Sequence, residues 1–227
     1  MGIKSLLKFL NDFPNIIKKS NINNFKGKKI AIDISILLYQ FVINIRNSGS
    51  DLTNKQGEIT SHILGLFNKT ILLLKRNIFP IYVFDGKPPD IKNKTLKSRK
   101  NNKLVSYLKM KETNNEEDKI KYFKRCVIIT EKQIEQCKEL LDLMGIPYIQ
   151  APEEADTQCA YLAKEGFVDG VLTNDMDILT FGAPIIYRNL ISYKLEPEVI
   201  KLDDILKRLK LDHEEFVEFC ILLGCDY

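Results

Sequence analysis

Short apolar runs recur along the chain, and each is bounded by polar or turn residues. Isoleucine, valine, tyrosine and phenylalanine are common in these runs, and such residues at this length are typical of buried strands. We expect a polar connection over residues 11–27, before the first strand. The predicted strands lie at residues 28–33, 80–85, 147–150, 170–173 and 184–188.

Between these runs, apolar residues recur three and four positions apart, as on one face of a helix. The helix that follows Thr130 carries a capping-box residue at Gln133 and a glycine stop at Gly145. Strands that alternate with helices predict an α/β fold, with a mostly parallel twisted sheet and helices on both faces. The predicted helices lie at residues 3–10, 34–46, 60–76, 131–144, 153–164, 202–209 and 214–223.

Residues 90–130 differ from the rest because they lack the apolar density of a core element. Their leucines fit a helical period, and a Thr-Asn-Asn break at 113–115 separates a second helix at 116–125. Residues 92–125 contain twelve Lys and Arg against four Asp and Glu, whereas the remaining chain has 22 basic and 26 acidic residues. We interpret this segment as two basic helices that stand off the sheet and contact a polyanion.

The amino-acid composition indicates the class of protein and the kind of metal site that the chain can form. A chain of 227 residues with 44% hydrophobic and 28% charged residues is typical of one globular domain. It has no apolar run of the ~20 residues needed to span a membrane, and its N-terminus lacks the apolar block of a signal peptide. We therefore expect an intracellular protein. Five cysteines without a C-x-x-C pair and two histidines argue against zinc and disulfides. A metal site would therefore use oxygen ligands, which favours Mg²⁺ or Mn²⁺.

Carboxylates follow the predicted strands at several places. Any one of them is explained by a helix cap or a turn. As a set they are expected to converge at the carboxyl ends of parallel strands, where ligands bind in such sheets. Two-metal phosphodiester hydrolysis needs carboxylates arranged in this way. The seven acids are Asp33, Asp85, Glu154, Asp156, Asp175, Asp177 and Asp226.

Several sequence motifs, in the same order along the chain, resemble those of flap endonucleases, which belong to the structure-specific 5′ nuclease superfamily. The resemblance covers nearly the whole chain. The motifs are Met1-Gly2-Ile3, Ala31-Ile32-Asp33, Tyr82-Val83-Phe84-Asp85-Gly86-Lys87-Pro88-Pro89, Met144-Gly145-Ile146-Pro147-Tyr148, Ala151-Pro152-Glu153-Glu154-Ala155-Asp156, Asp175-Met176-Asp177 and Leu222-Leu223-Gly224-Cys225-Asp226-Tyr227.

This resemblance implies a PIN-like 5′-nuclease fold in which residues 1–227 form one nuclease domain. Residues 1–105 would form its N-terminal region, 90–130 a basic helical arch and 131–227 its internal region. The implied activity is 5′ flap endonuclease and 5′–3′ exonuclease cleavage of DNA in replication and repair, with two Mg²⁺ ions or Mn²⁺ as a substitute. The resemblance makes all seven acids metal ligands and adds a catalytic role for Asp175 and Asp177. It also implies a nuclear location if the source is eukaryotic.

The resemblance further assigns contacts with DNA. Lys92 and Arg99 correspond to a basic pair that engages the scissile phosphate, and Tyr39 to an aromatic residue that stacks on a base. Such stacking is worth ~1–3 kcal/mol. The implied DNA-binding residues are Gly2, Tyr39, Arg46, Lys69, Lys92, Arg99 and Glu154.

The chain departs from the family pattern at three places. Asp156 stands where flap endonucleases usually have Glu, and Lys69 stands where Arg is usual, which loses a bidentate fork. Related proteins continue beyond the position of Tyr227 into a K⁺-binding helix–turn–helix element, so this chain is either an excerpt or a short protein.

The expected partner is DNA with a 5′ flap or branched junction, bound by a monomer that has no membrane contact. A sliding clamp is expected only if a C-terminal tail exists. Two alternatives remain: a non-catalytic module that binds branched DNA, and an RNA-directed nuclease of the same fold.

Overall fold

A computed structural model of the chain describes residues 3, 5–45, 51–192 and 194–225. The chain forms two compact units. The sheet unit comprises residues 1–34, 71–89 and 147–227, and the helical unit comprises residues 35–70 and 90–146. Each unit is described separately below.

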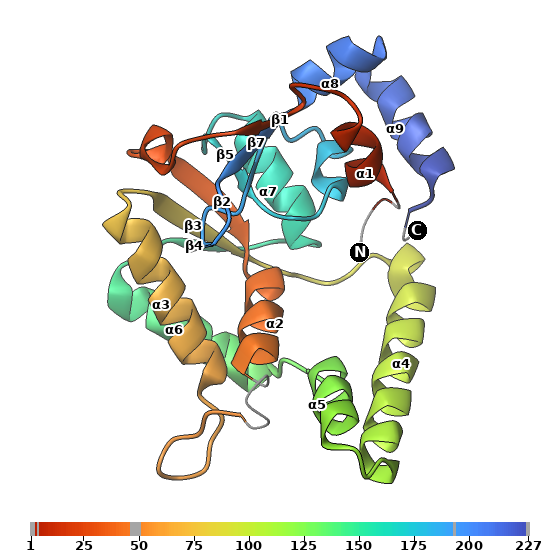
Figure 1. Cartoon of the computed structure of the whole chain (residues 1–227). Helices are drawn as coiled ribbons and strands as arrows, with labels where there is room; N and C mark the ends of the chain where they lie inside the picture. The colour runs from red at the N-terminus through yellow and green to blue at the C-terminus, as the bar shows by residue number, and fades with distance from the viewer. Residues whose placement is uncertain (1–2, 4, 46–50, 193, 226–227) are drawn as a thin grey trace. The chain divides into compact units, whose positions relative to one another are not determined.

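One seven-stranded sheet lies in the sheet unit, in the strand order β1-β7-β6-β5-β2-β3-β4 (Figure 1). The five strands from β6 to β4 are parallel, whereas β7 and β1 add an antiparallel edge. The mostly parallel sheet predicted from the sequence is therefore confirmed. The strands are β1 (Ile17–Lys19), β2 (Lys29–Asp33), β3 (Phe79–Phe84), β4 (Tyr148–Gln150), β5 (Gly170–Leu172), β6 (Ile185–Arg188) and β7 (Glu198–Lys201).

The prediction of a polar connection over residues 11–27 was wrong in part. That segment contains β1 and the 3-10 helix η1 (Ile22–Phe25), whose Phe25 side chain is buried against Tyr187. β1 has three residues and is formed by pairing with β7, which the sequence also did not predict. Ile17 is the one apolar residue of β1, so this strand lacks the apolar run by which β4 and β5 were predicted.

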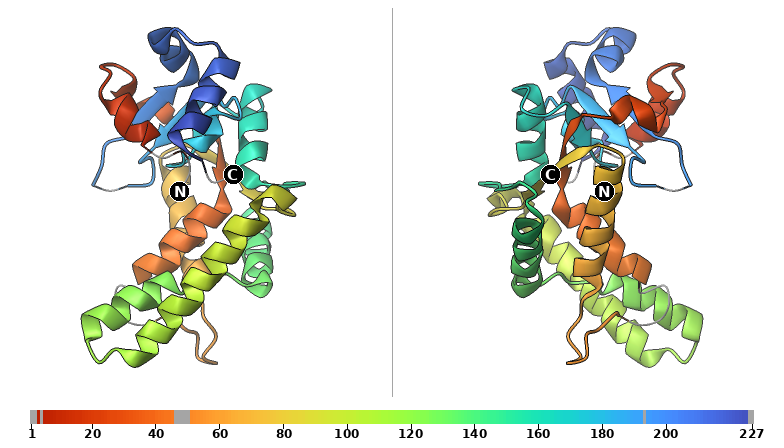
Figure 2. Two further views of the ribbon diagram at one scale, coloured as in Figure 1. Left: turned by 90° about the vertical axis from the view of Figure 1, so that its right-hand side faces the viewer. Right: turned by 90° about the vertical axis from the view of Figure 1, so that its left-hand side faces the viewer.

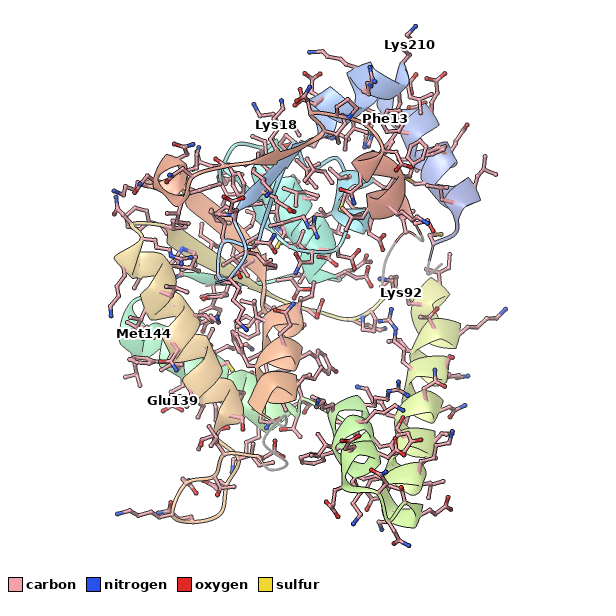
Figure 3. The ribbon with its side chains drawn as sticks, viewed as in Figure 1. Phe13, Lys18, Lys92, Glu139, Met144 and Lys210 are labelled. Carbon is pink, nitrogen blue, oxygen red and sulfur yellow. The ribbon has the colours of Figure 1, made fainter. Side chains whose placement is uncertain are left out.

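Helices of the sheet unit enclose an apolar core with one face of the sheet. They are α1 (Leu6–Asn11), α7 (Ala155–Lys164), the 3-10 helix η4 (Asp177–Leu179), α8 (Leu202–Leu209) and α9 (His213–Leu223). The ring centroids of Phe9 in α1 and Phe219 in α9 lie 5.2 Å apart. The Arg208 guanidinium of α8 lies 5.6 Å from the ring centroid of Phe13, which Figure 3 labels beyond the end of α1.

The helical unit contains the basic segment as two helices. After the 3-10 helix η3 (Asp90–Lys92), α4 (Asn93–Glu112) and α5 (Glu116–Arg125) lie side by side (Figure 2). Asn115 caps α5 by accepting bonds from the Glu117 and Asp118 amides. The two-helix prediction for this segment is confirmed. The remaining helices are α2 (Ile34–Ile45), α3 (Ser61–Lys75) and α6 (Glu131–Met144), of which α2 and α3 each extend into the sheet unit.

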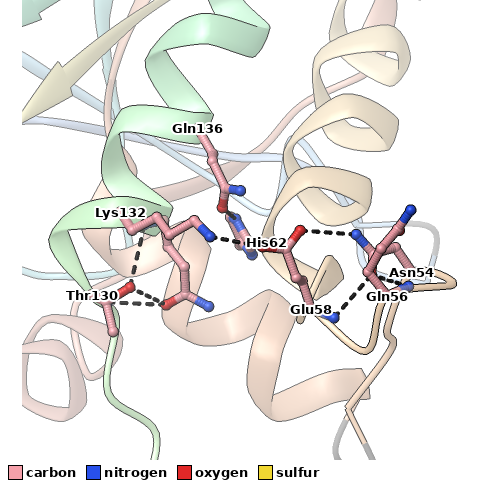
Figure 4. A network of polar contacts seen from close by, with 8 residues as sticks. Asn54, Gln56, Glu58, His62, Thr130, Lys132 and Gln136 are labelled. Atoms are coloured by element: carbon pink, nitrogen blue, oxygen red, sulfur yellow. Dashed lines mark hydrogen bonds and ion pairs between the residues drawn. The ribbon is translucent and has the colours of Figure 1, made fainter.

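A polar network within the helical unit joins α3 and its preceding loop to α6 (Figure 4). Nε2 of the buried His62 lies 2.9 Å from Oε1 of Gln136, and the Lys132 ammonium donates to Glu58 at 2.8 Å. Burial lowers the pKa of His62, which favours its neutral form. His62 therefore serves as a packing residue here. The predicted capping box of Thr130 and Gln133 and the Gly145 stop are present on α6.

None of the helices in the described ranges is both long enough and apolar enough to cross a membrane. No disulfide joins the five cysteines, all of which lie in those ranges.

Candidate active site at the carboxyl edge of the sheet

Four neighbouring parallel strands, β5, β2, β3 and β4, end at one edge of the sheet. Asp33 is the last residue of β2 and is 6% exposed. Asp85 directly follows β3, which pairs with β2 in a register that sets Asp33 opposite Val83. Six of the seven predicted acids therefore follow strands that end at one edge, and the seventh, Asp226, lies outside the described residues.

Asp85 is tied to the start of α7. Its Oδ1 accepts a 2.9 Å hydrogen bond from the Ala155 amide, so Asp85, rather than a residue of the helix, caps α7. The Gly86 amide donates to the Glu153 carbonyl at 2.5 Å, and Gln150 Nε2 donates to the Asp85 carbonyl at 2.5 Å. Three bonds thus hold the turn after β3 against the segment that carries the second pair of acids.

Glu154 and Asp156 lie at the beginning of α7. The sequence predicted a helix from residue 153, but α7 begins at Ala155 and Glu154 occupies the extended N-cap position. The helix thus begins two residues later than predicted, and its first amide is bonded by Asp85 from the turn after β3. Asp156 stands in the first turn, where the helix dipole favours an acid.

Asp175 and Asp177 occupy a loop with its own hydrogen bonds. Oγ1 of the buried Thr173 accepts from the Asp175 amide at 3.0 Å, and Asp175 Oδ1 accepts from the Asp177 amide at 3.2 Å. Thr180 Oγ1 donates to the Asp177 carbonyl at 2.6 Å. Met176, which lies between the two acids, is buried. Hydrogen bonds between side chains and the backbone of this loop therefore hold both acids in place.

Burial, together with the negative charges of several acids, raises the pKa of two thiols. Burial raises the pKa of Cys159 well above its ordinary value, and the negative charges of Asp33, Asp156 and Asp85 raise it further. Negative charges from three segments of the chain therefore act on one thiol of α7. Burial, followed by the charge of Asp177, raises the pKa of Cys220 in α9 to about 12. The charge of Asp177 thus acts on a thiol of α9.

The donor chemistry of this edge fits a hard cation because its predicted ligands are all carboxylates. The Oδ1 atoms of Asp156 and Asp177 are buried. Within the described ranges, however, no three Asp, Glu, His or Cys side chains are placed to hold one ion together. The acids are gathered at one edge, and side-chain movement is required for several of them to share an ion.

Four of the five predicted DNA-contact residues that the structure describes lie in the helical unit, whereas Glu154 lies in the sheet unit. Lys92 directly precedes α4, as Figure 3 shows, and Arg99 lies in the second turn of that helix. Lys69 lies in α3. Tyr39 of α2 accepts a hydrogen bond from Lys103 at 3.2 Å, and the Lys103 ammonium lies 4.9 Å from the Tyr39 ring centroid. Gly2 and Arg46 lie outside the described residues.

Sequence reasoning missed three side chains of these sites: Lys103, Gln150 and Thr173. Lys103 was hidden in a run of lysines. Gln150 contacts the carbonyl of a residue 65 positions away, which the sequence does not reveal. Thr173 did carry a signal, because a threonine two residues before an acid suits a local side-chain turn.

Two family models match the chain. The XPG N-terminal domain matches residues 1–105, and the XPG I-region matches residues 145–226. These matches place the chain in the class of XPG-type nucleases. With the mostly parallel sheet, they confirm the predicted PIN-like α/β fold class.

Similar proteins give a narrower assignment. Flap endonuclease 1 of Nematostella vectensis is 45% identical over 100% of this chain and 62% of its own length, and that of Homo sapiens is 42% identical over the same shares. Flap endonuclease-1 from Methanococcus jannaschii has 46% identity and a TM-score of 0.72, over 93% of this chain and 68% of that one. The catalytic core of Rad2 in complex with DNA substrate has 33% identity and a TM-score of 0.75, over 100% of this chain and 63% of the Rad2 chain. The chain belongs to the flap endonuclease family.

The chain spans about 62% of the length of the curated relatives that it matches. These relatives come from eukaryotes that include an animal and a plant. Flap endonucleases are metal-dependent nucleases, so the acidic edge of this chain has the chemistry that its family requires.

Proposed function

We propose that this chain is the nuclease core of a structure-specific 5′ flap endonuclease with 5′–3′ exonuclease activity on DNA, acting in replication and repair. The observation that carries the proposal is that six of the predicted acids follow four neighbouring parallel strands, which end at one edge of the sheet. Identity to flap endonucleases along the whole chain supports the same assignment. Residues 1–227 would act as a single nuclease domain.

The proposed cofactor is a pair of Mg²⁺ ions, with Mn²⁺ as a substitute. Bound ions supply a water of lowered pKa and neutralise the charge that develops on the phosphate. Asp156 has one methylene less than glutamate, so its carboxylate reaches less far from α7. The ligands would be Asp33, Asp85, Glu154, Asp156, Asp175, Asp177 and Asp226.

Side chains of the helical unit would orient the DNA. Lys92 and Arg99 would bind the scissile phosphate, and the Arg guanidinium can do so through two parallel hydrogen bonds. Tyr39 would stack on a base beside the cut, which requires the Lys103 ammonium to leave its ring. Arg46 and Lys69 would contact the DNA backbone. Gly2 and Glu154 would contact DNA close to the metal ligands.

The proposed substrate is DNA with a 5′ flap or a branched junction, bound by a monomer. Structures of relatives of this chain include Rad2 cores in complex with DNA substrate, which supports DNA as the partner. A sliding clamp would bind only through a C-terminal tail. We place the protein inside the cell without membrane contact, and in the nucleus if its source is eukaryotic, as its curated relatives are.

The proposal is tested by incubating the 227-residue chain with 5′-labelled flap DNA, the same flap made of RNA, and unbranched duplex DNA. We expect Mg²⁺-dependent cuts near the base of the DNA flap, little cutting of the other two, and no cutting with a chelator. Binding that weakens with salt, without cleavage in Mg²⁺ or Mn²⁺, would instead indicate a non-catalytic DNA-binding module. Preferred cutting of the RNA flap would indicate an RNA-directed nuclease.

A further inference from the structure

The loop after β5 is built on a threonine to which the resemblance assigns no role. Thr173 directly follows β5, and its amide continues the pairing with β6 by donating to the Tyr187 carbonyl at 3.2 Å. The sheet therefore fixes the Thr173 backbone. Its side chain is 4% exposed, so water has little access to the hydroxyl.

Two consecutive side-chain turns extend from this fixed residue. Thr173 Oγ1 accepts from the Asp175 amide at 3.0 Å, and Asp175 Oδ1 then accepts from the Asp177 amide at 3.2 Å. The first bond fixes the backbone from which the Asp175 carboxylate projects. The second holds one oxygen of that carboxylate at the start of η4, whose Ile178 and Leu179 are buried.

We infer that Thr173 is a positioning residue that sets the direction of the Asp175 and Asp177 carboxylates. This inference rests on the proposed function, in which both acids bind metal ions. An amide that loses its acceptor in this part-buried loop has to find another one, so the loop without the hydroxyl rearranges. Residues that orient metal ligands typically change metal affinity roughly 10–100-fold when they are removed.

The test compares Thr173→Val, which keeps the shape and removes the acceptor, with Thr173→Ser, which keeps the acceptor. Mn²⁺ binding is measured by titration calorimetry without DNA. We expect Thr173→Val to weaken Mn²⁺ affinity by roughly 10–100-fold and Thr173→Ser to restore most of it. Thr70→Val is the matched control, because the Thr70 hydroxyl is also buried and donates to the Leu66 carbonyl of its own helix.

The outcomes separate this inference from the function on which it rests. If Asp175→Asn abolishes Mn²⁺ binding and cleavage while Thr173→Val binds Mn²⁺ like the unchanged chain, the positioning role is wrong and the proposed site stands. If Asp175→Asn changes neither property, the proposed site fails as well. An equal loss of Mn²⁺ affinity in Thr173→Val and Thr70→Val would reduce Thr173 to a general packing residue.

Discussion

Asp175→Asn is expected to remove nearly all Mg²⁺-dependent cleavage of 5′-flap DNA while leaving the fold intact. The asparagine keeps the shape of the side chain, and its Oδ1 can still accept from the Asp177 amide. The substitution removes only the negative charge that a divalent ion requires. Metal ions stabilise such transition states by several kcal/mol, and each ~1.4 kcal/mol is a factor of ten. We therefore expect a loss of at least about 10²–10³-fold in the single-turnover rate.

Asp203→Asn provides the matched control for this prediction. Asp203 forms an exposed ion pair with Lys207 on α8, and pairs of this kind contribute little to stability. We expect its cleavage rate and melting temperature to remain unchanged. A rate for Asp175→Asn that is within a few-fold of the unchanged chain, with Mg²⁺ still required, would exclude Asp175 as an essential ligand.

Gly86→Ala is expected to cause the second large effect, because a β-carbon at this position has no room. It would lie 2.2 Å from the Ala151 carbonyl oxygen and 2.6 Å from that of Pro152. Both contacts are with backbone, which cannot rotate away. The turn after β3 must therefore move, and the bonds from Gly86 to Glu153 and from Ala155 to Asp85 would be strained together.

We expect Gly86→Ala to lower the free energy of unfolding by roughly 1–3 kcal/mol or more, and to weaken Mn²⁺ binding because Asp85 is displaced. Urea unfolding and calorimetry measure the two effects. Gly166→Ala is the control, since its β-carbon meets nothing within 4 Å and the cost comes from the positive φ of 76° alone. That variant should lose some stability and keep its Mn²⁺ affinity. Normal Mn²⁺ affinity in a folded Gly86→Ala protein would contradict the account of the Asp85 turn.

The sequence predicted the elements whose signals are local. α6 was predicted in full because its capping box and glycine stop lie within sixteen consecutive positions. β1 and β7 were missed because they hold one and two apolar residues among charged ones, and because they pair with each other across the sequence. The helical spacing of the leucines at positions 96, 104 and 108 predicted α4 correctly. These leucines are nevertheless exposed, because a helical spacing does not show which other segment, if any, packs against that face.

The position of six of the acids at one edge of the sheet could be predicted because they follow strands, and the parallel order of those strands brings their ends together. The bonds that hold the acids could not be predicted to the same extent. Asp85 caps a helix that begins 70 residues later, and Gln150 supports the Asp85 turn from the neighbouring strand. Such contacts depend on tertiary structure, so neither residue's spacing in the sequence indicates them.

We propose that metal ions held by these carboxylates act directly on the scissile phosphate of flap DNA. The most direct measurement uses a 5′ flap in which sulfur replaces one non-bridging oxygen at the cut site. Sulfur binds Mg²⁺ poorly and is accepted more readily by Mn²⁺. If a metal ion contacts this oxygen, we expect the substituted flap to be cut much more slowly than the normal flap in Mg²⁺. Mn²⁺ should remove most of this difference. An equal slowing in both metals, or cleavage that persists in a chelator, would contradict this proposal.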